Sequence, residues 1–494
     1  MVPESVVPIQ LLLATTAKVL CSAVFVSGRD PAEAFANSAV SALHGNQLPE
    51  ALAELARYEV DREHGQVHVR LQLDDATAAR LVAAHRAAYP GFGADWDAET
   101  RRLAGLGLLT RSARLVGDQG CQILPMDGDQ SLHFTPVPVA TKLPAAATLP
   151  WPMGDAPPAH SQVSAACRAQ VGAAIDAAFA ETQACNAAVL AVHRGEIVGE
   201  RYAQGIGPDT QLESWSMGKS VMATLIGLLV GRGLLALDEP APVDAWREPG
   251  DPRSRITLRH LLNMSSGLRC TGQDDARAAW RHGLPEHFLP YGEALNVAEF
   301  ATARPSEFEP GTVGRYRNCD SLTLAWLFRK TVAEKLGADP LSWPQAELFD
   351  RIGVRRQTLE TDRWGSFIIS GFDYGTPRNW ARLGLLYLND GIWQGERVLP
   401  EGWTTFATTP APAWEKGNYG GQIWLNRTGE YDLPRDAFYM AGGGGQHVFI
   451  VPSLDLVIVR MGHSRGYAHA KPVINALAGR IARACGYDPS ASRP

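Results

Sequence analysis

The sequence has no concentration of positive charge. Its 46 lysines and arginines are outnumbered by 52 acidic residues, the formal net charge at pH 7 is −6, and no block of lysine or arginine occurs. Proteins that bind nucleic acid usually carry such a block or a basic surface. The charge balance therefore gives no reason to expect a nucleic-acid partner, and it fits a small-molecule or peptide-like substrate better.

Cysteine is also sparse. The seven cysteines include no CxxC pair and no Cys/His spacing that is typical of a zinc site. We therefore expect neither a metal ion nor another cofactor. Cys21 and Cys121 are predicted to form a disulfide if the protein is exported, or to be two buried thiols, and the sequence leaves both alternatives open.

A long apolar run is absent as well. The apolar segment IQLLLATTAKVL near the N-terminus is interrupted by Lys18, and its roughly 12 residues are fewer than the ~20 that cross a bilayer. The segment lacks the basic start of a secretory signal, so it is either a degenerate export signal or a first buried helix. We expect no integral membrane span and an extracytoplasmic location, periplasmic or secreted, with the cytoplasm as the alternative.

Three segments differ in composition. Residues 1–126 are predicted to form a small α+β module, in which Gln66 to Leu73 (QVHVRLQL) alternates polar and apolar residues as a half-buried strand does. Residues 127–160 are rich in proline, which fixes φ and removes backbone donors, and they read as a linker or a strap. Residues 161–494 form the third segment. The first module gathers no acid, base and nucleophile, so we assign it no chemistry.

The third segment begins and ends with the same kind of elements. Near its start, AAVLAVHRGEIVGERY follows an alanine-rich helix and reads as two strands around a turn. Near its end, QHVFIVPSLDLVIVRMGH reads as two strands before a closing helix. Two terminal hairpins and two terminal helices predict one antiparallel sheet that is assembled from both ends of the domain. The predicted fold class is α+β, with helices flanking this sheet and a helical region inserted between the hairpins.

A serine and a lysine stand three positions apart at the start of an apolar helix. They are Ser216 and Lys219 in LESWSMGKSVMATLIGLL, and of the seven lysines only Lys219 follows a serine in this way. Positions i and i+3 share a helix face, which brings the amine beside the hydroxyl. A buried lysine can lose its proton and act as a base, and the helix N-terminus offers N–H groups to an oxyanion. Alone, the pair also fits a solvated first turn.

Two further motifs accompany the pair. Tyr316 and Asn318 lie in GRYRNCDSLTLAWLF, just before an apolar helix. There a tyrosine can be held as phenolate or share its proton, and an asparagine amide can point at Lys219 or at a substrate carbonyl. The other motif is the run of four glycines in FYMAGGGGQHVFIVP, which includes Gly442 and Gly443. Glycine beside a strand marks a place where a ligand or another backbone comes close.

In this order and these contexts, the three motifs resemble the penicillin-recognising serine hydrolases. Residues 165–485 are similar to the class C β-lactamase and penicillin-binding-protein family, which includes family VIII esterases and 6-aminohexanoate-dimer (nylon-oligomer) hydrolases. RHLLNMSSGL and YGGQIWLN are further similar pieces. The resemblance implies that Ser216 is the nucleophile, that Lys219 is its general base and that Tyr316 assists proton transfer.

The resemblance also assigns a substrate-binding group. It implies that Asn318 and Gly442 contact substrate and that the N–H of Gly443 pairs with that of Ser216 as an oxyanion hole. Met440 stands where β-lactamases have the lysine of their K-T-G motif, and methionine cannot hold a substrate carboxylate.

The implied function is hydrolysis of small esters or linear amides through an acyl-enzyme. The alternatives are a D-amino-acid peptidase or β-lactamase activity, and a non-catalytic module that binds peptidoglycan fragments. No oligomeric state is predicted.

Overall fold

The computed structural model describes residues 5–40, 48–158, 160–276, 283–464 and 467–490, and its largest sheet has six antiparallel strands. The strand order is β12-β13-β14-β15-β5-β6, so the first hairpin of the third segment pairs with the last. The strands are β5 (Asn186–His193), β6 (Glu196–Tyr202), β12 (Trp424–Leu425), β13 (Phe438–Gly442), β14 (Gln446–Val451) and β15 (Leu456–Gly462). The predicted sheet, assembled from both ends, is confirmed.

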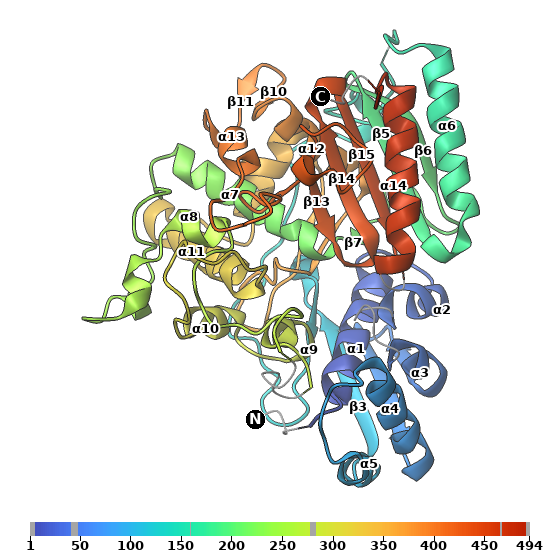
Figure 1. Cartoon of the computed structure of the whole chain (residues 1–494), viewed down its shortest axis with the longest axis vertical. Helices are drawn as coiled ribbons and strands as arrows, with labels where there is room; N and C mark the ends of the chain where they lie inside the picture. Colours follow the sequence, from blue (N-terminus) through green and yellow to red (C-terminus); the bar gives the residue numbers. More distant parts are fainter. Residues whose placement is uncertain (1–4, 41–47, 159, 277–282, 465–466, 491–494) are drawn as a thin grey trace.

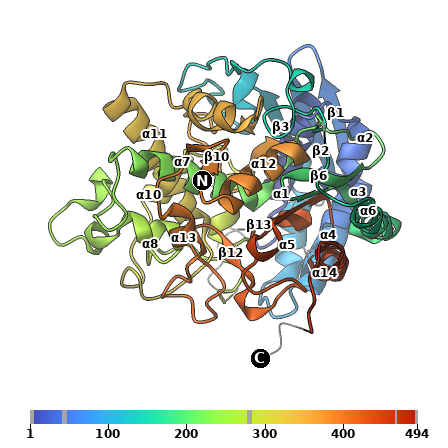
Figure 2. The same ribbon diagram turned by 90° about the horizontal axis from the view of Figure 1, so that it is seen from above.

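Helices cover both faces of this sheet (Figure 1). α6 (Ala165–Ala180) and α14 (Tyr467–Ala484) pack against each other on one face, and α12 (Pro377–Leu388) packs on the other. Figure 2 shows α6 and α14 nearly end-on, side by side. Gly199 of β6 allows α6 to approach, because a Cβ there would lie 3.0 Å from Val171. The α+β class with a helix-flanked antiparallel sheet is confirmed.

The region between the hairpins is largely helical. α7 (Gly218–Gly231) is buried along most of its length and packs on α11 (Asn318–Leu336). The other helices are α8 (Leu258–Leu262), α9 (Leu289–Gly292), α10 (Val297–Thr302) and α13 (Trp403–Thr408). The small strands are β7 (Leu212–Glu213), β8 (Thr358–Leu359), β9 (Asp373–Gly375), β10 (Ile392–Trp393) and β11 (Glu396–Arg397). β9 lies between β7 and β8, which fixes the strand that leads to Ser216.

The N-terminal segment forms a second antiparallel sheet. Its order is β1-β2-β3-β4, and β2 spans Gln66–Leu73 as the sequence predicts. The other strands are β1 (Arg57–Asp61), β3 (Gly107–Leu115) and β4 (Cys121–Ile123). The helices are α1 (Ile9–Phe25), α2 (Pro31–Ala34), α3 (Leu48–Leu55), α4 (Asp75–Ala88) and α5 (Trp96–Ala104).

Helix α1 connects the N-terminal sheet to the third segment (Figure 1). It is a buried helix, which was one of the two readings of the N-terminal run, and it packs on β2, β3 and α9. Its Lys18 is fully buried and forms an ion pair with Glu360, which follows β8. One hydrophobic cluster continues from α1 to α7. The division at residue 126 therefore separates segments that share a core, and it stays a prediction.

Residues 127–158 lie as a strap over the third segment. The His133 N–H donates to the Arg363 carbonyl oxygen at 2.8 Å, and Thr141 Oγ1 donates to the Asp350 carboxylate at 2.6 Å. Of the two readings of this proline-rich stretch, these contacts fit the strap.

The N-terminal segment contains Cys21 and Cys121, which were expected to be either a disulfide or two thiols, and the apolar run that was expected not to span a membrane. Cys21 and Cys121 are both buried and free, which agrees with the buried-thiol alternative. Among the helices in the described ranges, none combines the length and the apolar content that a bilayer crossing needs.

Candidate active site

Ser216 follows a strained turn between β7 and α7. The Ser214 N–H donates to the Asp373 carbonyl oxygen at 3.0 Å, which holds the end of β7. Trp215 then has a φ of 50°, in the left-handed region that is unfavourable for a side chain with a Cβ. Ser216 is the middle residue of the short 3₁₀ helix Trp215–Met217 that leads into α7. Ser216 is partly exposed, whereas the other residues from 211 to 220 are buried.

The Lys219 amine lies against the Ser216 hydroxyl. Nζ is 3.1 Å from Ser216 Oγ and donates to the Ser370 carbonyl oxygen at 2.9 Å. Lys219 is 1% exposed, and burial lowers its pKa well below the ordinary lysine value, with the nearby Asp373 carboxyl opposing the shift. Burial also raises the pKa of Asp373 well above its usual range. Both groups therefore favour their neutral forms, and a neutral amine can accept the hydroxyl proton.

The Tyr316 ring lies over the same amine. Its centroid is 4.7 Å from Lys219 Nζ. Burial raises the pKa of Tyr316 well above its ordinary value, although the Ser216 side chain acts to lower the pKa of its hydroxyl, so the phenol is favoured over the phenolate. Trp424 stacks on the ring, with 5.4 Å between the centroids. The structure thus brings together the three residues that the sequence analysis expects to carry the chemistry.

Asn318 is linked to this group only indirectly. Its Nδ2 donates to the His287 carbonyl oxygen at 2.6 Å and to the Tyr291 hydroxyl oxygen at 2.9 Å. The Tyr291 hydroxyl donates in turn to the Ser370 carbonyl oxygen at 2.6 Å, which is the oxygen that also accepts from Lys219. The amide nitrogen is therefore directed to the protein and not to Lys219, and contact of Asn318 with substrate stays a prediction.

Tyr291 and the Ser370 carbonyl are the parts of the site that the sequence analysis missed. Tyr291 is buried in α9, and burial raises its pKa above the ordinary tyrosine value, so its hydroxyl remains a donor. Its ring packs on Trp215 and Phe372, with centroids 5.9 and 5.3 Å away. Ser370 contributes only a backbone oxygen, which no residue type can signal. A sequence pattern could not have found either contact without the fold.

The glycine run meets the nucleophile turn at the end of β13. A Cβ on Gly442 would overlap the Ser214 carbonyl oxygen and lie 3.1 Å from Ser216 N, so only glycine allows this approach. Gly443 follows directly and opens the turn into β14. Met440 is fully buried in the core. The structure therefore places Gly442 beside the Ser216 backbone. That the N–H of Gly443 donates to the oxyanion stays a prediction.

Two named relatives share part of this sequence. A 6-aminohexanoate-dimer hydrolase from Paenarthrobacter ureafaciens is 23% identical over 303 residues, which are 56% of this chain and 73% of the relative. Esterase EstB from Burkholderia gladioli is 30% identical over 204 residues, which are 38% of this chain and 50% of the relative.

The fold and a family profile agree with these relatives. The crystal structure of a family VIII carboxylesterase aligns with a TM-score of 0.51 and 17% identity, covering 66% of this chain and 99% of that one, and so shares the fold. The Beta-lactamase family profile matches residues 171–482, more than half of the chain. The chain therefore belongs to the beta-lactamase family.

Proposed function

We propose that this protein is a serine hydrolase that cleaves small esters or linear amides through an acyl-enzyme on Ser216. A hydrolase fits its family and the names of its relatives, an esterase and a 6-aminohexanoate-dimer hydrolase. The observation that carries the proposal is the 3.1 Å contact between Ser216 Oγ and the Nζ of Lys219, a buried amine whose pKa is lowered by desolvation.

In the acylation step, the neutral Lys219 amine takes the proton of Ser216 while Oγ attacks the substrate carbonyl carbon. The oxyanion that forms accepts hydrogen bonds from the N–H groups of Ser216 and Gly443. The ammonium on Lys219 is stabilised by the Ser370 carbonyl oxygen, which is 2.9 Å from Nζ. Tyr316 donates its phenolic proton to the leaving oxygen or nitrogen and regains a proton from Lys219.

In the deacylation step, a water molecule attacks the acyl carbonyl and gives its proton to the same base. Ser216 then leaves as the hydroxyl, and the acid product departs. The leaving group thus departs with the equivalent of the Ser216 proton, and a proton from water restores the Ser216 hydroxyl, so the mechanism needs no cofactor.

The position of Met440 supports the proposed substrate class. Its side chain is fully buried and uncharged, so it offers no cation to a carboxylate on the substrate. A β-lactam or a D-alanyl peptide carries such a carboxylate, whereas a simple ester or a linear amide need not carry one at this position. The buried methionine therefore supports esters and linear amides over the β-lactamase and peptidase alternatives.

Hydrolysis of short-chain p-nitrophenyl esters and of the 6-aminohexanoate linear dimer tests the proposal. We expect Ser216→Ala to lose turnover by at least about 10³-fold, as removal of a nucleophile does. Ser220→Ala is the matched control, because Ser220 lies on the same helix and its hydroxyl donates to the Gln422 carbonyl oxygen at 2.7 Å. It should keep most of the activity.

Three results would count against the proposal. Turnover that survives in Ser216→Ala would exclude Ser216 as the nucleophile. Hydrolysis of a penicillin, or its covalent attachment, without ester or amide turnover would favour the β-lactamase or peptidase alternative. The absence of turnover and labelling in a folded protein would favour the non-catalytic module.

A further inference from the structure

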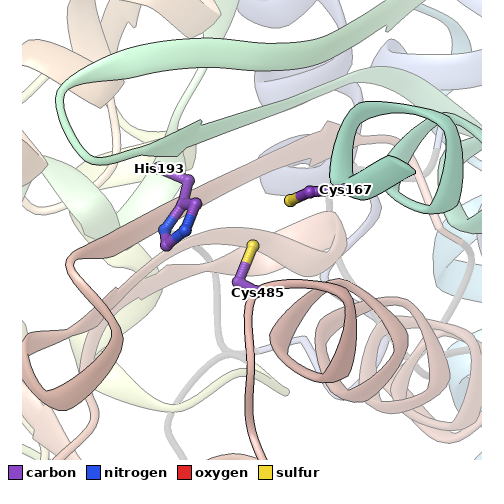
Figure 3. A group of neighbouring side chains, drawn as sticks. All are labelled: Cys167, His193 and Cys485. Carbon is purple, nitrogen blue, oxygen red and sulfur yellow. The ribbon is translucent and has the colours of Figure 1, made fainter. Parts of the chain in front are cut away.

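Three potential metal ligands from distant parts of the chain meet on the face of the sheet covered by α6 and α14. Cys167 lies in the first turn of α6, His193 is the last residue of β5, and Cys485 follows α14. The two sulfur atoms and an imidazole nitrogen all lie within 4.8 Å of one another. Figure 3 shows the three side chains converging. The cluster shares no residue with the candidate active site.

The hydrogen bond of His193 fixes its tautomer. Nδ1 lies 3.3 Å from the Asp455 carbonyl oxygen, and because a carbonyl can only accept, Nδ1 carries the proton. Nε2 then keeps its lone pair for a ligand bond. His193 is 6% exposed, and a ring N–H donated to a backbone carbonyl is the usual way in which a metal-binding histidine is oriented.

The two thiols are neighbours. Burial, together with the neighbouring Cys167, raises the pKa of Cys485 to about 12. Arg194, in the turn between β5 and β6, acts in the opposite direction because its charge favours the thiolate. Two thiol sulfurs and an imidazole form a donor set that selects soft or borderline metal ions such as Zn²⁺ and Cu⁺ over Mg²⁺ and Ca²⁺.

We propose that Cys167, His193 and Cys485 bind one thiophilic metal ion, with Zn²⁺ as the expected occupant and water as the fourth ligand. Tetrahedral zinc with ordinary Zn–S and Zn–N bonds holds its ligand atoms about 3.5–3.8 Å apart. Closing the cluster from its 4.8 Å limit therefore needs side-chain shifts of about 1 Å. Binding releases the two thiol protons, and the two thiolates balance the charge of the ion without any electron transfer.

A metal ion here would connect α6, β5 and α14. These elements are the first helix, an inner strand next to the edge strand β6, and the last helix of the region around the six-stranded sheet. The ion would therefore stabilise the fold and take no part in hydrolysis. The ligands are 26 and 292 positions apart in the chain. No spacing pattern detects such a set, which explains why the sequence analysis expects no metal.

Zinc binding by tag-free protein in a reducing buffer tests the site. We expect wild type to keep about one zinc ion per chain after desalting, and Co²⁺ to produce sulfur-to-metal charge-transfer absorption. Cys485→Ser and His193→Asn should each weaken binding by more than about 100-fold, because even changes behind the ligands cost 10–100-fold. Cys185→Ser is the matched control, since Cys185 lies outside the cluster, and it should bind zinc like wild type.

A second measurement needs no variant. Cys167 and Cys485 are both partly exposed, so iodoacetamide can reach them. Zinc should protect these two cysteines from alkylation, as read by peptide mass spectrometry, while Mg²⁺ should not. Equal alkylation with and without zinc would overturn the proposal. So would zinc binding that is unchanged in both ligand variants, or a Cys167–Cys485 disulfide that persists in the reducing buffer.

Discussion

Lys18 and Lys219 are both almost completely buried, at 0% and 1% exposure, but their surroundings differ. Lys18, on α1, forms an ion pair with Glu360. Lys219, on α7, contacts two neutral oxygens, Ser216 Oγ and the Ser370 carbonyl. A carboxylate partner keeps a buried amine as a structural cation, whereas neutral partners favour the free amine that can act as a base. Lys18 links the N-terminal segment to the third segment, and Lys219 is suited to act as a general base.

Replacing Lys219 should have the largest effect. We expect Lys219→Met to lower kcat/KM for a p-nitrophenyl ester by about 10⁴-fold, the upper range for loss of a general base, without lowering the free energy of unfolding. Lys330→Met is the matched control, because Lys330 lies on α11 and pairs with the exposed Asp244. Activity retained in Lys219→Met, or lost equally in both variants, would remove the distinction between the two buried lysines.

Replacing Lys18 should affect stability and not chemistry. Lys18→Met leaves Glu360 buried without its cation, so we expect the free energy of unfolding in urea to fall by about 3–5 kcal/mol. Turnover per folded molecule should be unchanged. The double variant Lys18→Met/Glu360→Gln removes both charges and should recover most of the loss. A double variant no more stable than the single one would show that the ion pair is not the cause.

The pH dependence of activity and stability should reveal the lowered pKa of Lys219. Because the pKa of Lys219 is lowered by burial, kcat/KM should rise about tenfold per pH unit below that pKa and reach a plateau well below 10.4, the approximate pKa of an ordinary lysine. Between the lowered pKa of Lys219 in the folded protein and the ordinary value of about 10.4 in the unfolded chain, the unfolded chain binds a proton that the folded protein does not. The free energy of unfolding should therefore increase with pH in this range. Lys219→Met should abolish this increase. An activity profile that rises only near pH 10 would contradict a neutral base.

Tyr291 should give the smallest effect. Tyr291→Phe keeps the ring and removes the hydrogen bond to the Ser370 carbonyl, so kcat should fall about fivefold, the equivalent of about 1 kcal/mol. Tyr387→Phe is the matched control, because Tyr387 is equally buried and its hydroxyl lies 3.0 Å from Thr224 Oγ1. It should lose similar stability and keep its activity. An equal loss of kcat in both variants would show that Tyr291 acts only through packing.

The features that could be predicted from the sequence depend on local signals. β2 and the two terminal hairpins follow from a period of two and from turn residues. The contact between Ser216 and Lys219 follows from a spacing of three on a helix. Tyr316 was assigned to the site because the three motifs occur in the same order as in the family that the sequence resembles.

The rest depends on contacts between residues far apart in the chain. The ion pair of Lys18 reaches across to Glu360, and Tyr291 reaches the carbonyl of Ser370. Periodicity and spacing carry no information about which distant segments meet. The direction of the Asn318 amide was missed for the same reason, since its partners lie on α9 and the turn before it.

The pairing of β5 with β15 also bears on how the protein is made. His193 is opposite Leu456 in the register, so the ribosome must add 263 residues after His193 to reach Leu456. At typical synthesis rates this takes roughly 15 to 50 seconds. During that time β5, whose residues 187–193 are all buried in the finished fold, has no β15 to pair with. The nascent chain thus exposes an apolar sheet edge, so the yield of folded protein should depend on chaperones that cover this strand.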